Sequence, residues 1–386
     1  MSVPLLILGL VLLITLIVVH ELGHYLVAVK NGVEAEEFGI GFPPRIWGKK
    51  LKNGTLLSFN WLPLGGFVKL KGEHDSDRQP GSYGAANLWT KTKIMTAGVA
   101  MNLVTALVLL TVLAIVGMPK VIDNQFTVTK DTKTIKNEVM IGYVEPASPA
   151  EKSGLKVGDQ LLAFHAHNEI NCLSLNCPRP ETINITNQQK LPDITKQLAG
   201  QEIQINYIRN GHSMITQANL LTASVVQKSQ NTNNPKGYLG ISPIEYTITR
   251  STWSAPIVAL GLAKQIIWLT FQGLGHIVSS LASGHTSQAT QQVAGPVGIF
   301  VLIKDGSTLG YQFILFIIAV ISLTLAIMNI LPIPALDGGR LFVTWFYRLI
   351  RRPLTKRTEE RIHGTGFALL MLLFVLITIV DIKRYF

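Results

Sequence analysis

Residues 3–29 of the 386-residue chain read VPLLILGLVLLITLIVVHELGHYLVAV, an apolar stretch that holds His20, Glu21 and His24 near its end. At about 1.5 Å per helical residue, this stretch is longer than the roughly 30 Å hydrocarbon core of a bilayer. No basic segment precedes it and no small-residue cleavage signal follows, so we expect a retained membrane-spanning helix and not a cleaved leader.

The composition of the whole chain indicates a membrane protein. Apolar residues make up 48% of it and charged residues only 15%, whereas soluble domains carry about a quarter charged residues. The two cysteines are too few for a disulfide scaffold. The net charge of +11 could indicate a nucleic-acid partner, but membrane topology accounts for the basic residues better, so we expect no nucleic-acid binding.

Three further apolar segments, 94–117, 311–331 and 365–380, are candidates for membrane crossing. Ten Lys and Arg residues lie in 30–93 and seven in 340–361. The positive-inside rule places both basic segments in the cytoplasm if the chain crosses four times, with the N- and C-termini outside.

Residues 253–274 are apolar but contain Lys264, Gln265 and Gln272, so they read as an amphipathic helix. Counting them as a span would put the two basic segments on opposite sides, and we expect them to lie on or dip into the outer interface. The expected divisions are a first span in 1–30, a cytoplasmic loop in 31–93, a second span in 94–117, a soluble domain in 118–240, an amphipathic helical region in 241–310, a third span in 311–339, a basic loop in 340–362 and a fourth span in 363–386.

Two segments outside the spans have β-sheet signals. Asn53-Gly54 between strand-like runs predicts a β-hairpin, which we expect to be membrane-associated and covered by protein, because lipid does not tolerate free strand edges. Within a soluble domain at 126–225, residues 141–162 predict a strand, a short helix ending at Gly154, a Gly-Asp turn and a second strand. This pattern resembles the α+β PDZ domains of bacterial envelope proteases, which bind extended peptides by strand addition.

Residues 165–195 look like an insertion in that domain. Cys172 and Cys177 could form a local disulfide on the outer side of a membrane. Together with His165 and His167 they could instead bind a metal, although no closed-site spacing matches well. We expect neither arrangement to be catalytic.

The motif His20-Glu21-Leu22-Gly23-His24 carries the predicted chemistry. On a helix, residues i and i+4 share a face, so both imidazoles can bind one metal ion beside Glu21 as a general base. Ionisable residues inside an apolar span are costly and usually mark function. The alternative is a polar patch at the inner end of the span.

A hydrolytic zinc site needs a third protein ligand and an open position. Asp337 is the candidate, because it follows the third span, which runs in the same direction as the first. By itself, Asp337-Gly-Gly would indicate a plain turn. The prolines before it break the backbone, which at membrane depth is tolerated where it lines a cavity.

With these motifs the chain resembles the site-2 protease family of intramembrane zinc metalloproteases, close to its bacterial RseP-type members. The matching elements are the motif at 20–24, LPLGGFVKL at 62–70, the single PDZ-like insert, AGPVG at 294–298 and NILPIPALDGG at 329–339. The second span carries GVAMN at 98–102, where the family usually has Gly-Pro-x-x-Asn.

The resemblance implies a zinc metalloendopeptidase in which Zn²⁺ is bound by His20, His24 and Asp337, with Glu21 as the catalytic base. It also implies that Asn102 and Asn329 bind the substrate backbone; packing between helices is the other role open to them. The hairpin could receive the unwound substrate as an added strand.

The resemblance further implies location in a bacterial cytoplasmic (inner) membrane and single-span membrane proteins as substrates. Membrane-anchored anti-sigma factors of stress responses and signal-peptide remnants are the expected kinds. The PDZ domain would recognise peptide ends or exclude untrimmed substrates, and an upstream site-1 protease would trim them. Two other functions stay open: a transporter or proton relay that uses the intramembrane His, Glu and Asp residues, and an inactive PDZ scaffold.

Overall fold

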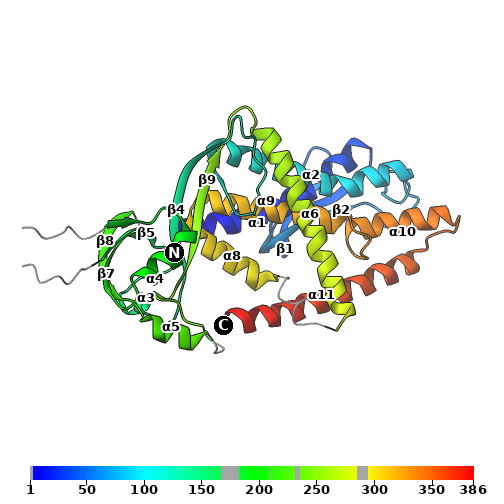
Figure 1. Ribbon diagram of the computed structural model, residues 1–386. Helices are drawn as coiled ribbons and strands as arrows, with labels where there is room; N and C mark the ends of the chain where they lie inside the picture. Colours follow the sequence, from blue (N-terminus) through cyan, green and yellow to red (C-terminus); the bar gives the residue numbers. More distant parts are fainter. Residues whose placement is uncertain (1–2, 167–181, 210, 231–234, 285–293) are drawn as a thin grey trace, which may run out of the picture. The chain divides into compact units, whose positions relative to one another are not determined.

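The computed structural model describes residues 3–166, 182–209, 211–230, 235–284 and 294–386 (Figure 1). The chain divides into two compact units. Unit 1 consists of Met1–Met118, Asn124–Asp131 and Ser251–Phe386, and unit 2 consists of Pro119–Asp123 and Thr132–Arg250. All of the predicted catalytic and metal-binding residues belong to unit 1.

Unit 1 is built mainly from helices. They are α1 (Val3–Lys30), α2 (Leu88–Val116), α6 (Ala255–Ala282), α8 (Pro296–Leu309), α9 (Tyr311–Ile330), α10 (Asp337–Leu349) and α11 (Lys356–Tyr385). Five of them, namely α1, α2, α6, α9 and α11, are long and apolar enough to cross a membrane. This agrees with a multi-pass membrane protein, whereas the predicted count of four spans stays a prediction, because α6 qualifies as well.

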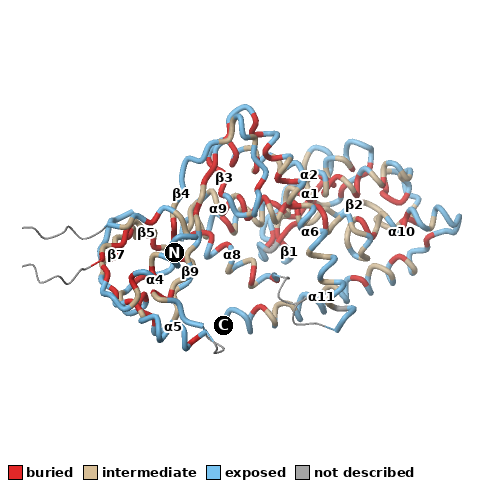
Figure 2. Tube along the Cα trace, in the orientation of Figure 1, coloured by how far each residue is buried: buried red, intermediate tan, exposed pale blue. Residues whose placement is uncertain are grey.

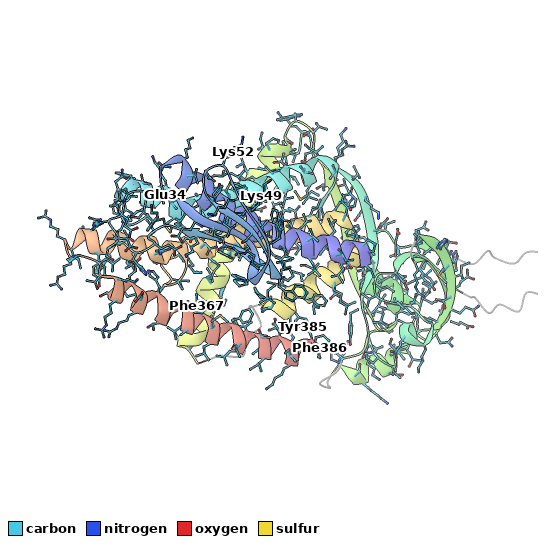
Figure 3. All side chains as sticks on the ribbon, turned by 180° about the vertical axis from the view of Figure 1, so that it is seen from behind. Glu34, Lys49, Lys52, Phe367, Tyr385 and Phe386 are labelled. Carbon is cyan, nitrogen blue, oxygen red and sulfur yellow. The ribbon has the colours of Figure 1, made fainter. Side chains whose placement is uncertain are left out.

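Helices α1, α2 and α9 pack against one another, and α8 packs on α1 and α9. Apolar side chains from three of these helices meet in a buried cluster of Leu16, Ile303, Ile314, Ile317 and Ile318. Helix α11 is largely exposed by comparison (Figure 2), and from Phe367 on, which Figure 3 labels, many of its exposed side chains are large and apolar. An apolar exposed surface of this kind suits contact with lipid.

Two helices begin before the apolar segments that mark them in the sequence. The Asn87 side chain accepts a hydrogen bond from the backbone N–H of Thr90, so α2 begins at Leu88 and not at residue 94. Thr355 caps α11 in the same way, so this helix begins at Lys356 and not near residue 363. A search for apolar length misses these first turns, because they contain charged residues such as Lys91 and Lys93 in α2 and Lys356 and Arg357 in α11. The side-chain caps stabilise the helix starts.

The predicted hairpin is confirmed as β1 (Ala35–Lys50) and β2 (Leu56–Leu70), which pair antiparallel around Gly54. Lys49 and Lys52, labelled in Figure 3, lie at this turn. The strands bend so that β1 pairs with β2 more than once: Phe38 is opposite Val68 and also opposite Leu57. As a result, residues 66–70 run along α1, next to the segment that carries the two histidines.

A carboxylate anchors the start of α6. Asp131 accepts hydrogen bonds from the hydroxyls of Ser254 and Thr252 and from their backbone N–H groups. These bonds, first that of the Ser254 hydroxyl and then that of Thr252, hold the pKa of Asp131 well below its usual range. Asp131 thus supplies acceptors to donors that the helix itself leaves unpaired.

Unit 2 contains a sheet in the order β9-β4-β5-β7-β8, with β6 beside β5. Its elements are β4 (Lys133–Val144), α3 (Pro149–Lys152), β5 (Gln160–Ala166), β6 (Thr182–Asn184), α4 (Leu191–Gln197), β7 (Glu202–Arg209), β8 (His212–Asn219), α5 (Ala223–Ser229) and β9 (Ile241–Arg250), and the two-residue strand β3 (Met118–Pro119) lies at the junction of the units. The predicted strand, short helix and second strand are present as β4, α3 and β5. Gly154 follows α3 with a φ of 80°.

The insertion is described only in part. His165 on β5 forms hydrogen bonds with Thr182 and Asn206. His167, Cys172 and Cys177 lie outside the described residues.

Candidate metal centre

Two histidines of α1 fill the space between α1 and α2. His20 and His24 are one turn apart on α1, and both are buried. Gly98 of α2 lies against their rings: a Cβ there would be 2.4 Å from Nε2 of His24 and 2.6 Å from Cε1 of His20. A Cβ on Gly23 would be 2.6 Å from the carbonyl oxygen of Ala97. The two glycines therefore let α1 and α2 approach each other closely. The gap that remains between the helices is filled by the imidazoles.

The Asp337 carboxylate reaches the histidines from the first turn of α10, which packs against the end of α9. Two prolines in the connection prevent α9 from continuing beyond Ile330. A Cβ on Gly338 would lie 2.3 Å from the carbonyl oxygen of Ile330, and one on Gly339 would lie 2.0 Å from that of Ile333. Only glycine fits at these two positions, so the Asp-Gly-Gly sequence is required by the turn that delivers Asp337.

The three side chains converge on one point. Oδ2 of Asp337 lies 3.1 Å from Nε2 of His20 and 3.1 Å from Nε2 of His24, and the two Nε2 atoms are 3.2 Å apart. Ligand atoms about 2.0–2.2 Å from a tetrahedral zinc ion stand roughly 3.3 Å from one another. The spacing therefore fits three ligands of one zinc ion, with the fourth position left open. No other such group of His, Cys, Asp or Glu occurs in the described part of the chain.

The outer nitrogens of both rings have partners that set the metal-binding tautomer. Nδ1 of His24 lies 2.7 Å from the carbonyl oxygen of Ile94. A carbonyl only accepts, so Nδ1 carries the proton and Nε2 keeps a free lone pair. Hydrogen bonds of this kind also fix the orientation of a ligand ring.

The Asn102 amide plays the same part for His20. Its Nδ2 lies 3.2 Å from Nδ1 of His20, while its Oδ1 has no hydrogen-bond partner among the described residues. The two ends of an amide are told apart by their hydrogen bonds. Turning the amide by 180° lets Oδ1 accept the Nδ1–H of His20 and leaves Nε2 free, and we assign it that orientation. The Ser322 hydroxyl donates a hydrogen bond of 2.8 Å to the backbone carbonyl oxygen of Asn102, which connects α9 to this part of α2.

Glu21 shares a cavity with two of the three candidate ligands, His24 and Asp337. Its Oε2 accepts a hydrogen bond of 3.2 Å from the backbone N–H of Val68. A cavity of about 90 Å³ is lined by Glu21, His24 and Asp337 together with residues of β2. A carboxylate able to accept a proton therefore lies beside the open side of the site.

A sequence model of peptidase family M50 matches residues 8–373 of the chain. The chain belongs to peptidase family M50. The match begins in α1 and ends in α11, so it includes all three candidate ligands of this M50 peptidase. The predicted membership in the site-2 protease family is thereby confirmed.

Relatives of the M50 peptidase match over almost their full lengths. A protein of Clostridium perfringens named a putative zinc metalloprotease is 30% identical over 369 residues, which cover 95% of this chain and 95% of the relative. Zinc metalloprotease RasP of Shouchella clausii is 25% identical over 452 residues, covering 96% and 97%. Zn²⁺ is accordingly the expected cofactor, and the nitrogen and oxygen donors above suit it.

One predicted site residue of the M50 peptidase stands apart. The structure brings together five of the predicted site residues: His20, Glu21, His24, Asp337 and Asn102. Asn329 is the exception, because its half-buried side chain on α9 forms no hydrogen bond within the described residues. Asn102 contacts a candidate ligand, not open space, which favours an orienting role for it. The sequence showed the spacing of this residue but not its partner.

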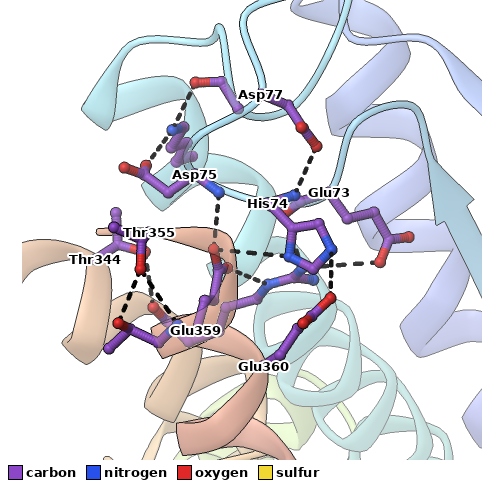
Figure 4. Close-up of polar contacts among 12 residues, drawn as sticks. Glu73, His74, Asp75, Asp77, Thr344, Thr355, Glu359 and Glu360 are labelled. Atoms are coloured by element: carbon purple, nitrogen blue, oxygen red, sulfur yellow. Dashed lines mark hydrogen bonds and ion pairs between the residues drawn. The ribbon is translucent and has the colours of Figure 1, made fainter. Parts of the chain in front are cut away.

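Sequence reasoning missed a polar cluster beside Asp337 (Figure 4). Arg340, three residues after Asp337, donates to the carbonyl oxygen of Glu73 at 2.8 Å, and its Nε lies 3.8 Å from Oε1 of Glu359. Glu359 also accepts a hydrogen bond of 2.9 Å from the backbone N–H of Asp75. The cluster thus connects the loop after β2, the start of α10 and the start of α11.

The residues beneath this cluster, Tyr83, Lys91 and Asp75, are buried. The guanidinium of Arg340 lies 5.4 Å from the ring centre of Tyr83. Burial raises the pKa of the Tyr83 phenol, and the Arg340 charge opposes that rise. Lys91 pairs with Asp75, and both side chains are almost inaccessible to solvent. Such pairs require both partners, since either charge left alone in the interior would be costly.

A second cavity, of about 420 Å³, reaches Asp337 from the side of this cluster. His74, Glu359 and His363 line it. Nδ1 of His74 and Nε2 of His363 are buried without a hydrogen-bond partner in the described part of the protein. A roomy site with such polar groups suits bound water, and this cavity lies next to Asp337.

Proposed function

We propose that this M50 peptidase is a zinc endopeptidase that cleaves peptide bonds within or next to the membrane-spanning segments of other membrane proteins. The observation that carries the proposal is the convergence of His20, His24 and Asp337, with 3.1–3.2 Å between their donor atoms, on helices that include candidate membrane spans. Metal ligands placed in such helices have no structural use that would offset their cost in lipid.

His20, His24 and Asp337 would hold the zinc ion, which when bound acts as a Lewis acid and lowers the pKa of water. Glu21 takes up the proton of the attacking water and passes it to the leaving amine. Asn102 and Ile94 keep the two imidazoles in the binding tautomer. The polar cavity beside Arg340 supplies water, and the small cavity beside Glu21 restricts what else can enter.

The substrate would be presented as an extended strand. A helical segment hides its carbonyl groups in hydrogen bonds, so it must unwind before hydrolysis, and residues 66–70 of β2 offer a strand edge for it to join. Asn329 is the remaining candidate for a hydrogen bond to the substrate backbone, because its side chain has no partner among the described residues.

Unit 2 would act as a PDZ domain that controls access. Its strand, helix and strand sequence at β4, α3 and β5 supports this proposal. The expected substrates are anti-sigma factors or signal-peptide remnants in a bacterial inner membrane, trimmed first by another protease. Both chain termini would lie outside the cytoplasm, on the side away from the basic loops.

The test is cleavage of a single-span reporter by the purified, zinc-loaded protein. The parent, Glu21→Gln and Glu34→Gln are compared, since Glu34 is an exposed acid that pairs with Lys71. We expect the parent and Glu34→Gln to cleave at similar rates and Glu21→Gln to be slower by a factor on the order of 1,000, the scale of general-base catalysis. Equal cleavage by the parent and Glu21→Gln would refute the role of Glu21.

A further inference from the structure

The edge of β2 next to the metal centre has two outward-facing backbone donors. The backbone N–H of Lys71, just beyond the strand, donates to the carbonyl oxygen of Glu34 beside β1. Successive residues of a strand alternate in direction, so the N–H groups of Leu70 and Val68 face away from β1. They are the groups that an added substrate strand would need.

Both donors are already taken by carboxylates. The N–H of Val68 donates to Oε2 of Glu21 at 3.2 Å, and the N–H of Leu70 donates to Oε1 of Glu73 at 3.0 Å. Two acidic side chains therefore stand where the carbonyl oxygens of a third strand would be.

The space along this edge is too small for a peptide. The cavity bounded by Val68, Leu70, Glu73 and the metal centre measures about 90 Å³, whereas sites for small ligands measure about 300–1,000 Å³. Glu73 lines the cavity, and its side chain is 37% exposed. Moving this side chain is the simplest way to open the edge.

Glu73 also has a second partner within reach. Its Oε2 lies 3.7 Å from Nη2 of Arg340. A small rotation would convert this distance into a hydrogen-bonded ion pair without burying an uncompensated charge. Glu73 can therefore leave Leu70 at little cost.

We propose that Glu73 is a removable cap of the substrate strand site, displaced when a substrate strand bonds to Leu70 and Val68. The same strand displaces Glu21 from Val68 and so frees the base only when substrate is in place. Glu73 is a positioning and selectivity residue, since it competes with substrate and does not touch the reacting atoms. The inference rests on the proposed protease function and on strand addition.

The test compares Glu73→Ala, which removes the cap, with Glu73→Gln, whose amide oxygen can still accept from Leu70. Glu36→Ala serves as a control, because Glu36 is an exposed acid whose ion pair is with Lys69 on the same sheet. Binding of a labelled single-span peptide to the full-length, zinc-loaded protein is measured by fluorescence anisotropy, together with KM and kcat.

We expect Glu73→Ala to lower the Kd and KM by about fivefold, the scale of one competing hydrogen bond, and to leave kcat within about twofold. Glu36→Ala should match the parent, and Glu73→Gln, which keeps the cap but loses the ion pair with Arg340, should bind the peptide no more tightly than the parent. Glu73→Thr repeats the cap removal should the alanine variant fail to fold. Unchanged or weaker peptide binding in the cap-removed variants, or equal behaviour of Gln and Ala, would overturn the proposal. Anisotropy reports peptide binding even where the protein does not cleave the peptide. A parent protein that binds but does not cleave would therefore refute the protease function separately.

Discussion

Replacing Gly98 with alanine is the most informative single change at the metal centre. On the present backbone the new Cβ would lie 2.4 Å from Nε2 of His24 and 2.6 Å from Cε1 of His20. Non-bonded heavy atoms rest at about 3.5 Å or more, so relative to the 2.4 Å contact the ring or the helix must move by roughly 1.1 Å. Both imidazoles are affected, because both contact the same position.

The size of that shift sets the expected loss. A metal site tolerates errors of only about 0.2 Å in its ligand distances, and misplacing a reacting group by about 1 Å costs on the order of 100-fold in rate. We therefore expect Gly98→Ala to lose most of its zinc and to cleave the reporter on the order of 100-fold more slowly than the parent.

The assay measures zinc per chain by elemental analysis and reporter cleavage on the same preparations. Gly273→Ala, on another candidate span, α6, is the matched control, because its Cβ would meet no described residue within 4 Å. Full zinc content and a parental rate in Gly98→Ala would show that α2 does not pack closely on the imidazoles of His20 and His24.

Three other predictions follow from the described contacts. Asn102→Leu should weaken zinc binding about 10- to 100-fold. Asn102→Asp keeps an acceptor for His20 and should weaken zinc binding less than Asn102→Leu. Zinc titration measures the affinity of both variants. Lys91→Met should destabilise the protein by about 3–5 kcal/mol, because it removes the close partner of the buried Asp75 carboxylate and leaves it the weaker pairing with Arg348 at 3.8 Å. Unfolding in denaturant measures this, and parental stability would contradict the pairing. The pKa of Asp131 is lowered by the fold, so its contribution to stability is complete above about pH 4 and is lost as pH falls through the lowered value. The parent should accordingly be more thermally stable than Asp131→Asn at pH 7 and lose that advantage in strong acid, and a pH-independent difference would count against the carboxylate anchor.

The parts of the site that a sequence can predict are those fixed by local periodicity. His20 and His24 share a face because they are four residues apart on one helix, and the apolar length of α1 marks that helix as a candidate span. Asp337 required one further step, the matching direction of two spans. The two glycines after it turned out to be steric requirements of the α9–α10 turn.

Partners that are distant in sequence could not be predicted in this way. The contact between Arg340 and Glu73 joins residues 267 positions apart, and nothing local to either residue selects the other. Helix α6 illustrates the same limit. Gln265 was one of the three polar residues that made it look amphipathic, yet its side chain forms hydrogen bonds with Asn124 and Phe126 of the same unit. A polar residue satisfied by a tertiary contact cannot be distinguished in sequence from one that faces water.

The central claim is that one zinc ion is bound by two imidazoles of α1 and the carboxylate of Asp337. X-ray absorption at the zinc edge, recorded on the purified parent and on Asp337→Ala, tests it most directly. We expect nitrogen and oxygen neighbours at about 2.0–2.2 Å in the parent, no sulfur, and a loss of most bound zinc in the variant. A sulfur ligand, or full zinc occupancy with an unchanged spectrum in Asp337→Ala, would contradict it.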